Sequence, residues 1–154
     1  MKEVSVRFRK RRIPNQATIE EPLEDPKQVI GLFGSMQREM KERIITVCLD
    51  KKSRIMCHEV VAIGAVDRVQ TRVAEVFRAP IMLNASGVII LHNHPSGDPE
   101  PSQKDDLFTV ALMGGARSLD IELCDHIIIG NAGRFYSYAD QWLGWDALTP
   151  SKRK

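Results

Sequence analysis

The chain has 154 residues, of which 43% are hydrophobic and 27% are charged, and this composition suits a single domain with a real core. The formal net charge of +2 gives no strong field that would attract nucleic acid. No apolar run is long enough to span a bilayer, and residues 1–5 lack the apolar core of a signal peptide, so we expect a cytoplasmic protein.

The N-terminal segment predicts an exposed arm. Residues 2–13 alternate basic and apolar side chains, which indicates an edge strand or an extended arm. Its arginines, Arg7, Arg9 and Arg11, could contact phosphates or an acidic partner. A solvated edge strand that resists aggregation explains them at least as well.

The rest of the chain predicts alternating strands and helices. The expected elements are a loop over 14–25, a helix from Pro26 to about Met40, strands at Arg43–Leu49 and Ile55–Ile63, a helix over 70–84, a strand over 87–94, a helix over 102–118, and strands at Ile121–Ile129 and Arg134–Tyr138. Pro80 is expected to kink or break its helix, and the pair Gly114-Gly115 to weaken or end the next one. This order predicts an α/β fold with a mixed sheet and helices on its faces.

The three cysteines, Cys48, Cys57 and Cys124, are widely spaced and form no CxxC pair. Each lies in an apolar segment. A cysteine zinc site is therefore not expected, and buried free thiols are the favoured interpretation.

The most informative segment is His-Asn-His-Pro-Ser-Gly at 92–97, which ends an apolar run. Side chains two residues apart on a strand share a face, so His92 and His94 can converge on one metal ion. A rigid Pro/Gly turn follows. Ser102 is expected to cap the next helix, with Asp105 in its first turn. A strand end that faces a helix start brings this carboxylate back to the histidines and leaves a fourth zinc position for water.

Each part of this pattern also has a simpler interpretation. Ser102 and Asp105 form a helix-capping box on their own, and an isolated His-x-His is more often structural or solvated than a ligand. The combination of an apolar strand, a Pro/Gly turn and a capped helix favours a catalytic zinc site with three protein ligands.

A zinc hydrolase with three protein ligands usually needs a carboxylate beside the water. Glu42 is favoured because it stands at the start of the first core strand and could project towards the histidine strand. Glu59 could also reach inward, and Glu100 is nearest in sequence but lies on a turn. Glu39 and Glu75 are the remaining candidates, and spacing alone leaves the choice open.

The block at 92–105, His-Asn-His-Pro-Ser-Gly-Asp-Pro-Glu-Pro-Ser-Gln-Lys-Asp, resembles the RadC family, the bacterial branch of the JAB/MPN (JAMM) metalloprotease fold. The resemblance extends from about Glu42 to Tyr138 and implies an α+β, cytidine-deaminase-like architecture. It implies three parts, which are an N-terminal arm and helix over 1–41, a RadC-like JAB/MPN domain over 42–146 and a basic tail over 147–154.

The resemblance also implies a role for each site residue. One zinc ion per chain would be held by His92, His94 and Asp105. Ser102 matches the serine that helps to hold the tetrahedral intermediate. Glu42 matches the upstream glutamate that binds the nucleophilic water and moves its proton.

Other positions match less clearly or depart from the family pattern. Asp125 and His126 match a family segment of unclear role, in which His126 is either a residue behind the metal ligands or a core histidine. The 41 residues before the first core strand leave little room for the helix-hairpin-helix-like region of longer RadC proteins, which implies a short form. Arg72-Val73 stands where the family has His-Pro, which puts a substrate contact there in doubt.

The resemblance implies a zinc-dependent metallohydrolase, a peptidase or isopeptidase acting on an unknown protein or peptide. The alternative is a DNA-repair-associated or nucleic-acid-binding protein, with or without metal-dependent nuclease activity, which the family label and the basic segments 7–12 and 152–154 favour. A scaffold without metal is disfavoured by the complete ligand set. A membrane partner is not expected, and the basic edge segment and the tryptophan-containing tail could pack against a second copy.

Overall fold

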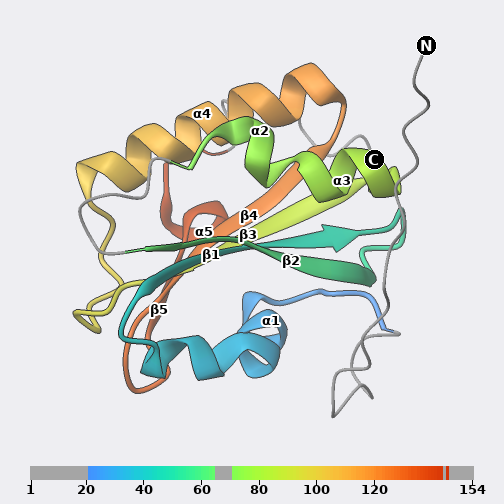
Figure 1. The fold of residues 1–154 in the computed structure, drawn as a ribbon. Coiled ribbons are helices and arrows are strands. Elements are labelled where there is room, and N and C mark those ends of the chain that lie inside the picture. The colour runs from blue at the N-terminus through green and yellow to red at the C-terminus, as the bar shows by residue number, and fades with distance from the viewer. Residues whose placement is uncertain (1–20, 65–70, 144, 146–154) are drawn as a thin grey trace.

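The computed structural model describes residues 21–64, 71–143 and 145. Their framework is a five-stranded sheet with the order β2-β1-β3-β4-β5 (Figure 1). The strands are β1 (Glu42–Leu49), β2 (Ile55–Gly64), β3 (Gly87–Asn93), β4 (Glu122–Ile129) and β5 (Phe135–Ser137). Only β3 and β4 pair in parallel, and the other neighbours are antiparallel. The predicted mixed sheet is confirmed.

Helices cover both faces of this sheet. The helices α2 (Val73–Val76), α3 (Arg78–Leu83) and α4 (Gln103–Leu119) lie on one face, and α1 (Pro26–Phe33) with the 3-10 helix η2 (Gly34–Arg38) lies on the other, whereas α5 (Tyr138–Gln141) follows β5 (Figure 1). Every residue of β3 is buried. Its alternate side chains enter two separate cores, Val88 and Ile90 on the α4 side and Ile89 and Leu91 on the α1 side.

The helix expected to reach Met40 ends earlier. Asp25 caps α1 as predicted, but the α-helix stops at Phe33 and continues only as η2. The sequence Gly34-Ser35 has low helix propensity, which accounts for the change at this point. Met40 therefore leaves the expected apolar stripe and is 92% exposed.

The helix expected over 70–84 is two short helices in its described part. The expected break is present and falls at Phe77, between α2 and α3, three residues before Pro80. Pro80 occupies the first turn of α3, where a backbone N–H has no helical partner to lose. The pair Gly114-Gly115 does not end α4, which continues to Leu119.

Several further expectations concern the cysteines, the membrane and the N-terminus. The three cysteines, all within the described residues, form no disulfide; Cys48 is buried, and Cys57 and Cys124 are half-buried. In the described part of the chain, no helix has both the length and the apolar character needed to cross a membrane. The arm with Arg7, Arg9 and Arg11 and the basic tail over 147–154 lie outside the described residues.

Candidate metal centre

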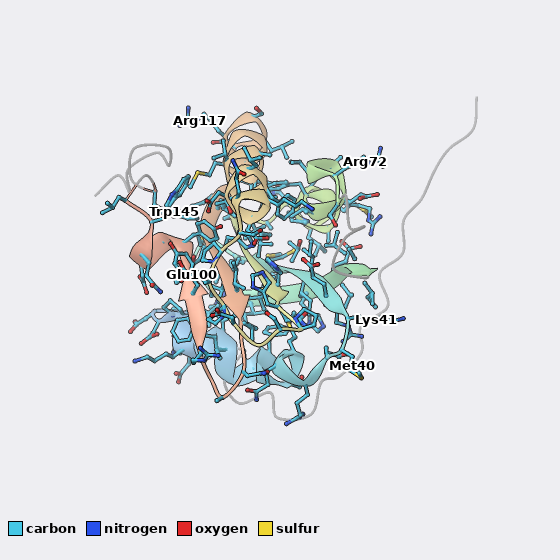
Figure 2. All side chains as sticks on the ribbon, turned by 90° about the vertical axis from the view of Figure 1, so that its left-hand side faces the viewer. Met40, Lys41, Arg72, Glu100, Arg117 and Trp145 are labelled. Atoms are coloured by element: carbon cyan, nitrogen blue, oxygen red, sulfur yellow. The ribbon has the colours of Figure 1, made fainter. Side chains whose placement is uncertain are left out.

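Three elements meet at one end of the sheet, and one of them, β1, is distant in sequence from the other two. The C-terminal end of β3, the N-terminus of α4 and the start of β1 lie together at the left-hand end of Figure 1. Figure 2 shows this end towards the viewer, with Glu100 on the left and Met40 and Lys41 at the lower right. Because Ile44 pairs with His92 in the antiparallel ladder, the first residues of β1 are held beside the histidines.

His92, His94 and Asp105 converge as the sequence predicts. One potential ligand atom from each lies within 4.8 Å of the others. The Nε2 atom of His92 is 3.6 Å from Asp105 Oδ1, and the Nε2 atom of His94 is 3.5 Å from Asp105 Oδ2. Ligand atoms on a tetrahedral zinc ion, at bonds of about 2.0–2.1 Å, are about 3.4 Å apart. The spacing of these atoms therefore suits one small cation.

The Nε2 atoms of both histidines face Asp105, in the position needed for ligand bonds to a shared ion. His94 Nδ1 lies 2.7 Å from the carbonyl oxygen of Asp98, so this nitrogen carries a proton and donates it. The Nε2 atom of His92 is buried and makes no hydrogen bond. A buried nitrogen without a partner, facing two carboxylates, is costly unless a cation lies between them. The residues present thus fit a metal ion with nitrogen and oxygen ligands.

The electrostatics keep His92 and Asp105 in the forms that bind metal. Burial, the largest cause, lowers the pKa of His92 to about 4, so this imidazole is neutral near pH 7. Burial alone would raise the pKa of Asp105, but a hydrogen bond from His94, the charge interaction with His92 and bonds from Ser102 outweigh it and hold that pKa well below its usual range. Neutral imidazole and ionised carboxylate are the forms that bind metal. Burial alone would lower the pKa of His94, but hydrogen bonds with Asp105 and Asp98 and the charges of Asp105 and Glu42 outweigh it and raise that pKa, so this ring has to lose a proton before it can bind a metal.

Glu42 is the carboxylate that reaches this centre. Its Oε1 atom lies 3.3 Å from His92 Nε2. Burial, followed by the negative charge of Asp105, raises the pKa of Glu42. Glu59, the other inward candidate, forms an ion pair with Arg78 instead. The geometry thus separates two candidates that the sequence left open.

The remaining three glutamates lie outside this arrangement. Glu39 pairs with Arg43 at 2.9 Å, and Glu75 receives the backbone N–H of Arg72 at the start of α2. Glu100 is exposed on the loop before α4.

Ser102 caps α4 and holds Asp105. Its hydroxyl lies 2.6 Å from Asp105 Oδ2, and its backbone N–H donates to the same oxygen at 2.7 Å. The Asp105 N–H returns a bond to the Ser102 oxygen at 3.3 Å. The predicted capping box is therefore present, and it orients the carboxylate towards the histidines.

The turn after the histidines is fixed by a close contact with the loop after β4. Gly97 has φ +82°, and a Cβ at this position would lie 2.0 Å from Asn131 Nδ2. Its carbonyl accepts bonds from the N–H of Asn131 and the guanidinium of Arg134, both at 2.9 Å. Glycine is required here for both conformation and space. The turn that carries Asp98 back to His94 is thereby anchored to the sheet.

Asp125 and His126, which are adjacent in sequence, have different roles in the structure. The carboxylate of Asp125 accepts bonds from the Ser137 hydroxyl and the Ala139 N–H, so it ties β4 to the start of α5. His126 is fully buried, and its Nε2 atom lies 3.3 Å from Nδ1 of His92. Of the two positions that the sequence left open for His126, the structure shows the one behind His92.

Sequence reasoning missed two residues of this site. Thr109 lies on α4 one turn after Asp105 and contacts His126 Nδ1 at 2.7 Å. Its signal was the i+4 spacing from Asp105, which puts both side chains on one face of the helix. Asn93 stands between the two histidines in sequence and is buried. Its side chain forms hydrogen bonds with the backbone on either side of Glu42. No local pattern predicts that long-range contact.

The fold and the His-His-Asp group together define a JAB-type domain with a candidate metal centre. The chain matches the family model of the RadC-like JAB domain over residues 23–143. Since this match covers most of the chain, the protein belongs to the family of RadC-like JAB domains.

Relatives from several organisms agree with this assignment. A UPF0758 protein of Methanosarcina barkeri is 42% identical over 127 residues, which are 80% of this chain and 55% of the relative. A UPF0758 protein of Roseiflexus sp. is 42% identical over 114 residues, 71% of this chain and 48% of that protein. One of Chloroflexus aurantiacus is 39% identical over 134 residues, 85% of this chain and 58% of that protein. The chain thus spans about half the length of the curated relatives it matches.

Proposed function

We propose that this protein is a zinc-dependent hydrolase that cleaves an amide bond in a peptide or protein substrate. The observation that carries the proposal is the position of Glu42, whose Oε1 atom lies 3.3 Å from His92 Nε2 at the edge of the His92, His94 and Asp105 group. Three protein ligands and a separate carboxylate are the combination that a hydrolase of this type needs.

The metal would be held by His92, His94 and Asp105. When bound, zinc lowers the pKa of water towards neutrality and polarises a carbonyl group. Glu42 accepts a proton from water as the water oxygen bonds to the scissile carbonyl carbon. It returns this proton to the amide nitrogen when the carbon–nitrogen bond breaks, so the same carboxylate serves both half-steps.

Two features of Glu42 suit this task. It is half-buried, and burial together with the negative charge of Asp105 raises its pKa, so the carboxylate holds the transferred proton more firmly than an exposed one would. Its backbone is fixed in β1, which orients the carboxylate without a mobile loop. Ser102 keeps Asp105 in place through two bonds and adds a hydroxyl near the reacting group.

The test combines metal analysis with cleavage of a fluorescence-quenched peptide library by the purified full chain. We expect about one zinc per chain, and loss of both zinc and cleavage in His92→Ala. Glu42→Gln is expected to keep its zinc and lose turnover by roughly 10²- to 10⁴-fold, the usual range for a general base. Glu39→Gln is the matched control, because Glu39 is a nearby carboxylate paired with Arg43.

Three results would each overturn the proposal. They are full turnover in Glu42→Gln, full turnover after removal of all metal, and the absence of cleavage across the library by protein that carries zinc. Loss of turnover in Glu39→Gln equal to that in Glu42→Gln would show that the effect is not specific to the carboxylate beside His92.

A further inference from the structure

A chain of hydrogen bonds runs from the metal centre into the core and back. His92 Nδ1 lies 3.3 Å from His126 Nε2, and His126 Nδ1 lies 2.7 Å from Thr109 Oγ1. Thr109 Oγ1 in turn lies 2.7 Å from the backbone carbonyl oxygen of Asp105. His126 and Thr109 are fully buried, and His92 is 1% exposed, so bulk solvent does not compete for these bonds.

The number of protons on Thr109 fixes the direction of this chain. The Asp105 carbonyl is only an acceptor, so its bond with Thr109 needs the single hydroxyl proton. Tyr138 also interacts with the Thr109 hydroxyl, but the Tyr138 proton goes to Asp106 Oδ1 at 2.8 Å, so towards Thr109 the Tyr138 oxygen is an acceptor as well. Both neighbours of the Thr109 hydroxyl thus compete for its proton, and none is left for His126. Thr109 Oγ1 therefore accepts from His126, and His126 carries its proton on Nδ1.

The same reasoning then fixes His92. With its proton on Nδ1, the neutral His126 ring offers Nε2 as an acceptor, so His92 must donate from its own Nδ1. The His92 Nε2 atom is left with a lone pair, and this is the buried atom without a hydrogen bond that faces Asp105 and Glu42. The His126 ring is held in place by stacking on Tyr138, with centroids 4.9 Å apart and planes 1° from parallel.

We propose that Thr109 is a positioning residue which, through His126, fixes His92 as the tautomer protonated on Nδ1 and so aims its Nε2 lone pair into the metal centre. This inference rests on the metal centre of the proposed function. It joins two ligands from different elements, because the chain begins at the backbone of Asp105 on α4 and ends at His92 on β3. Residues behind a metal ligand commonly set its tautomer in this way.

The variant pair Thr109→Val and Thr109→Ser separates the hydroxyl from the volume of the side chain. Valine has a similar shape but can neither accept from His126 nor donate to Asp105, whereas serine keeps both bonds. Thr46→Val is the matched control. Thr46 is also fully buried and its hydroxyl also donates to a backbone carbonyl, that of Val76, at 3.1 Å, but it lies outside the metal centre.

Two measurements read the result. Zinc affinity is obtained by competition with a chelator of known affinity, and the His92 tautomer by ¹⁵N NMR of the metal-free protein. We expect Thr109→Val to weaken zinc binding about 10- to 100-fold, the range for loss of such a partner, and Thr109→Ser to restore it. The wild-type spectrum should show His92 protonated on Nδ1, and Thr109→Val should change that signal.

A wild-type His92 protonated on Nε2 would overturn the inference, and this result needs no variant that folds. Equal zinc affinity in wild type and Thr109→Val, or equal losses in Thr109→Val and Thr46→Val, would also overturn it. The proposed function fails separately, if the wild type binds zinc and responds to Thr109→Val but cleaves no peptide. If the wild type binds no zinc, the proposed function fails. The ¹⁵N signal of His92 in wild type and in Thr109→Val then still tests whether Thr109 fixes the His92 tautomer.

Discussion

The side-chain Oδ1 atom of Asn93 accepts a hydrogen bond from the backbone N–H of Arg43 at 2.8 Å, and its Nδ2 atom donates to the carbonyl of Lys41 at 3.2 Å. The backbone pairing of β3 with β1 ends one residue earlier, at His92. The Asn93 amide therefore continues the ladder with its side chain, on both sides of Glu42. A residue on the strand face opposite to the histidines thus holds the backbone of the carboxylate beside them.

Replacement of Asn93 by alanine should loosen the start of β1. The variant leaves the Arg43 N–H without its partner, at a cost of about 1–3 kcal/mol. We expect hydrogen exchange of the Arg43 amide to accelerate by roughly 10- to 100-fold, measured by NMR. If the proposed function holds, turnover should fall by about 10²-fold through misplacement of Glu42, while zinc content stays the same.

Gln37→Ala is the control for this variant. The side-chain amide of Gln37 also accepts from a backbone N–H, at 3.3 Å, but this N–H belongs to Gly133 in the loop after β4. Gln37→Ala should leave the Arg43 exchange rate unchanged. Unchanged exchange in Asn93→Ala itself would show that pairing with β2 alone holds the start of β1.

Metal binding should stabilise the folded protein. A ligand that binds only the folded state at 100 times its dissociation constant adds about 2.7 kcal/mol, which raises the Tm of a domain of this size by several degrees. We expect zinc to raise the Tm of the wild type, a chelator to reverse this, and His92→Ala to show neither response. His58→Ala is the control, because His58 is a half-buried histidine on β2 that makes an edge-to-face contact with Phe33. A zinc response of equal size in His92→Ala would place the metal elsewhere.

The ligands could be predicted from sequence because their geometry is local. His92 and His94 share a face through strand alternation, and Ser102 places Asp105 through a helix cap three residues long. Glu42 was one of five candidates, because its place depends on the pairing of β1 with β3, some fifty residues apart along the chain. Contacts of this range leave no periodic signal in the sequence.

Helix predictions show a second limit of reasoning from the sequence, because helix propensity takes no account of neighbouring elements. Pro80 was expected to kink or break a helix, and the break is present three residues earlier, at Phe77, so that Pro80 occupies the first turn of α3. Gly115 was expected to weaken α4, yet it allows α4 to approach α2, because a Cβ on it would lie 2.4 Å from Val73 Cγ1. Propensity describes the isolated segment, whereas the packing of α4 against α2 determines the role of Gly115.

The adjacent glycines of α4 should respond oppositely to alanine. Gly114 is exposed and a Cβ there meets nothing within 4 Å, so Gly114→Ala should stabilise the protein by about 0.5–1 kcal/mol through helix propensity. Gly115→Ala should destabilise it by about 1–3 kcal/mol, because the branched side chain of Val73 has little freedom to move away. Urea unfolding of both variants tests this pair. Equal effects in the two variants would mean that α2 and α4 are not in close contact.

A carboxyl group away from the metal centre should make stability depend on pH. Burial, the largest cause, raises the pKa of Asp125 to about 7, despite the bonds it accepts from Ala139 and Ser137. In the unfolded chain the pKa is about 3.9. The folded state thus binds the extra proton between these values. The stabilising contribution is complete below about pH 4 and is lost as the pH rises through about 7.

The variant Asp125→Asn tests this pH dependence, since its side chain has a similar shape and does not ionise. Unfolding in urea between pH 5 and 8, with chelator present to exclude metal effects, should show wild type losing stability relative to the variant as the pH rises. About two pH units of this window lie below the folded pKa of about 7, which sets an upper limit of about 2.7 kcal/mol on the change. The loss of one accepted bond in the variant adds an offset that does not vary with pH, so only the slope is informative. Asp140→Asn, which removes an exposed carboxylate nearby, should give a much smaller slope. Parallel curves for wild type and Asp125→Asn would mean that the bonds from Ser137 and Ala139 compensate fully for burial of the charge.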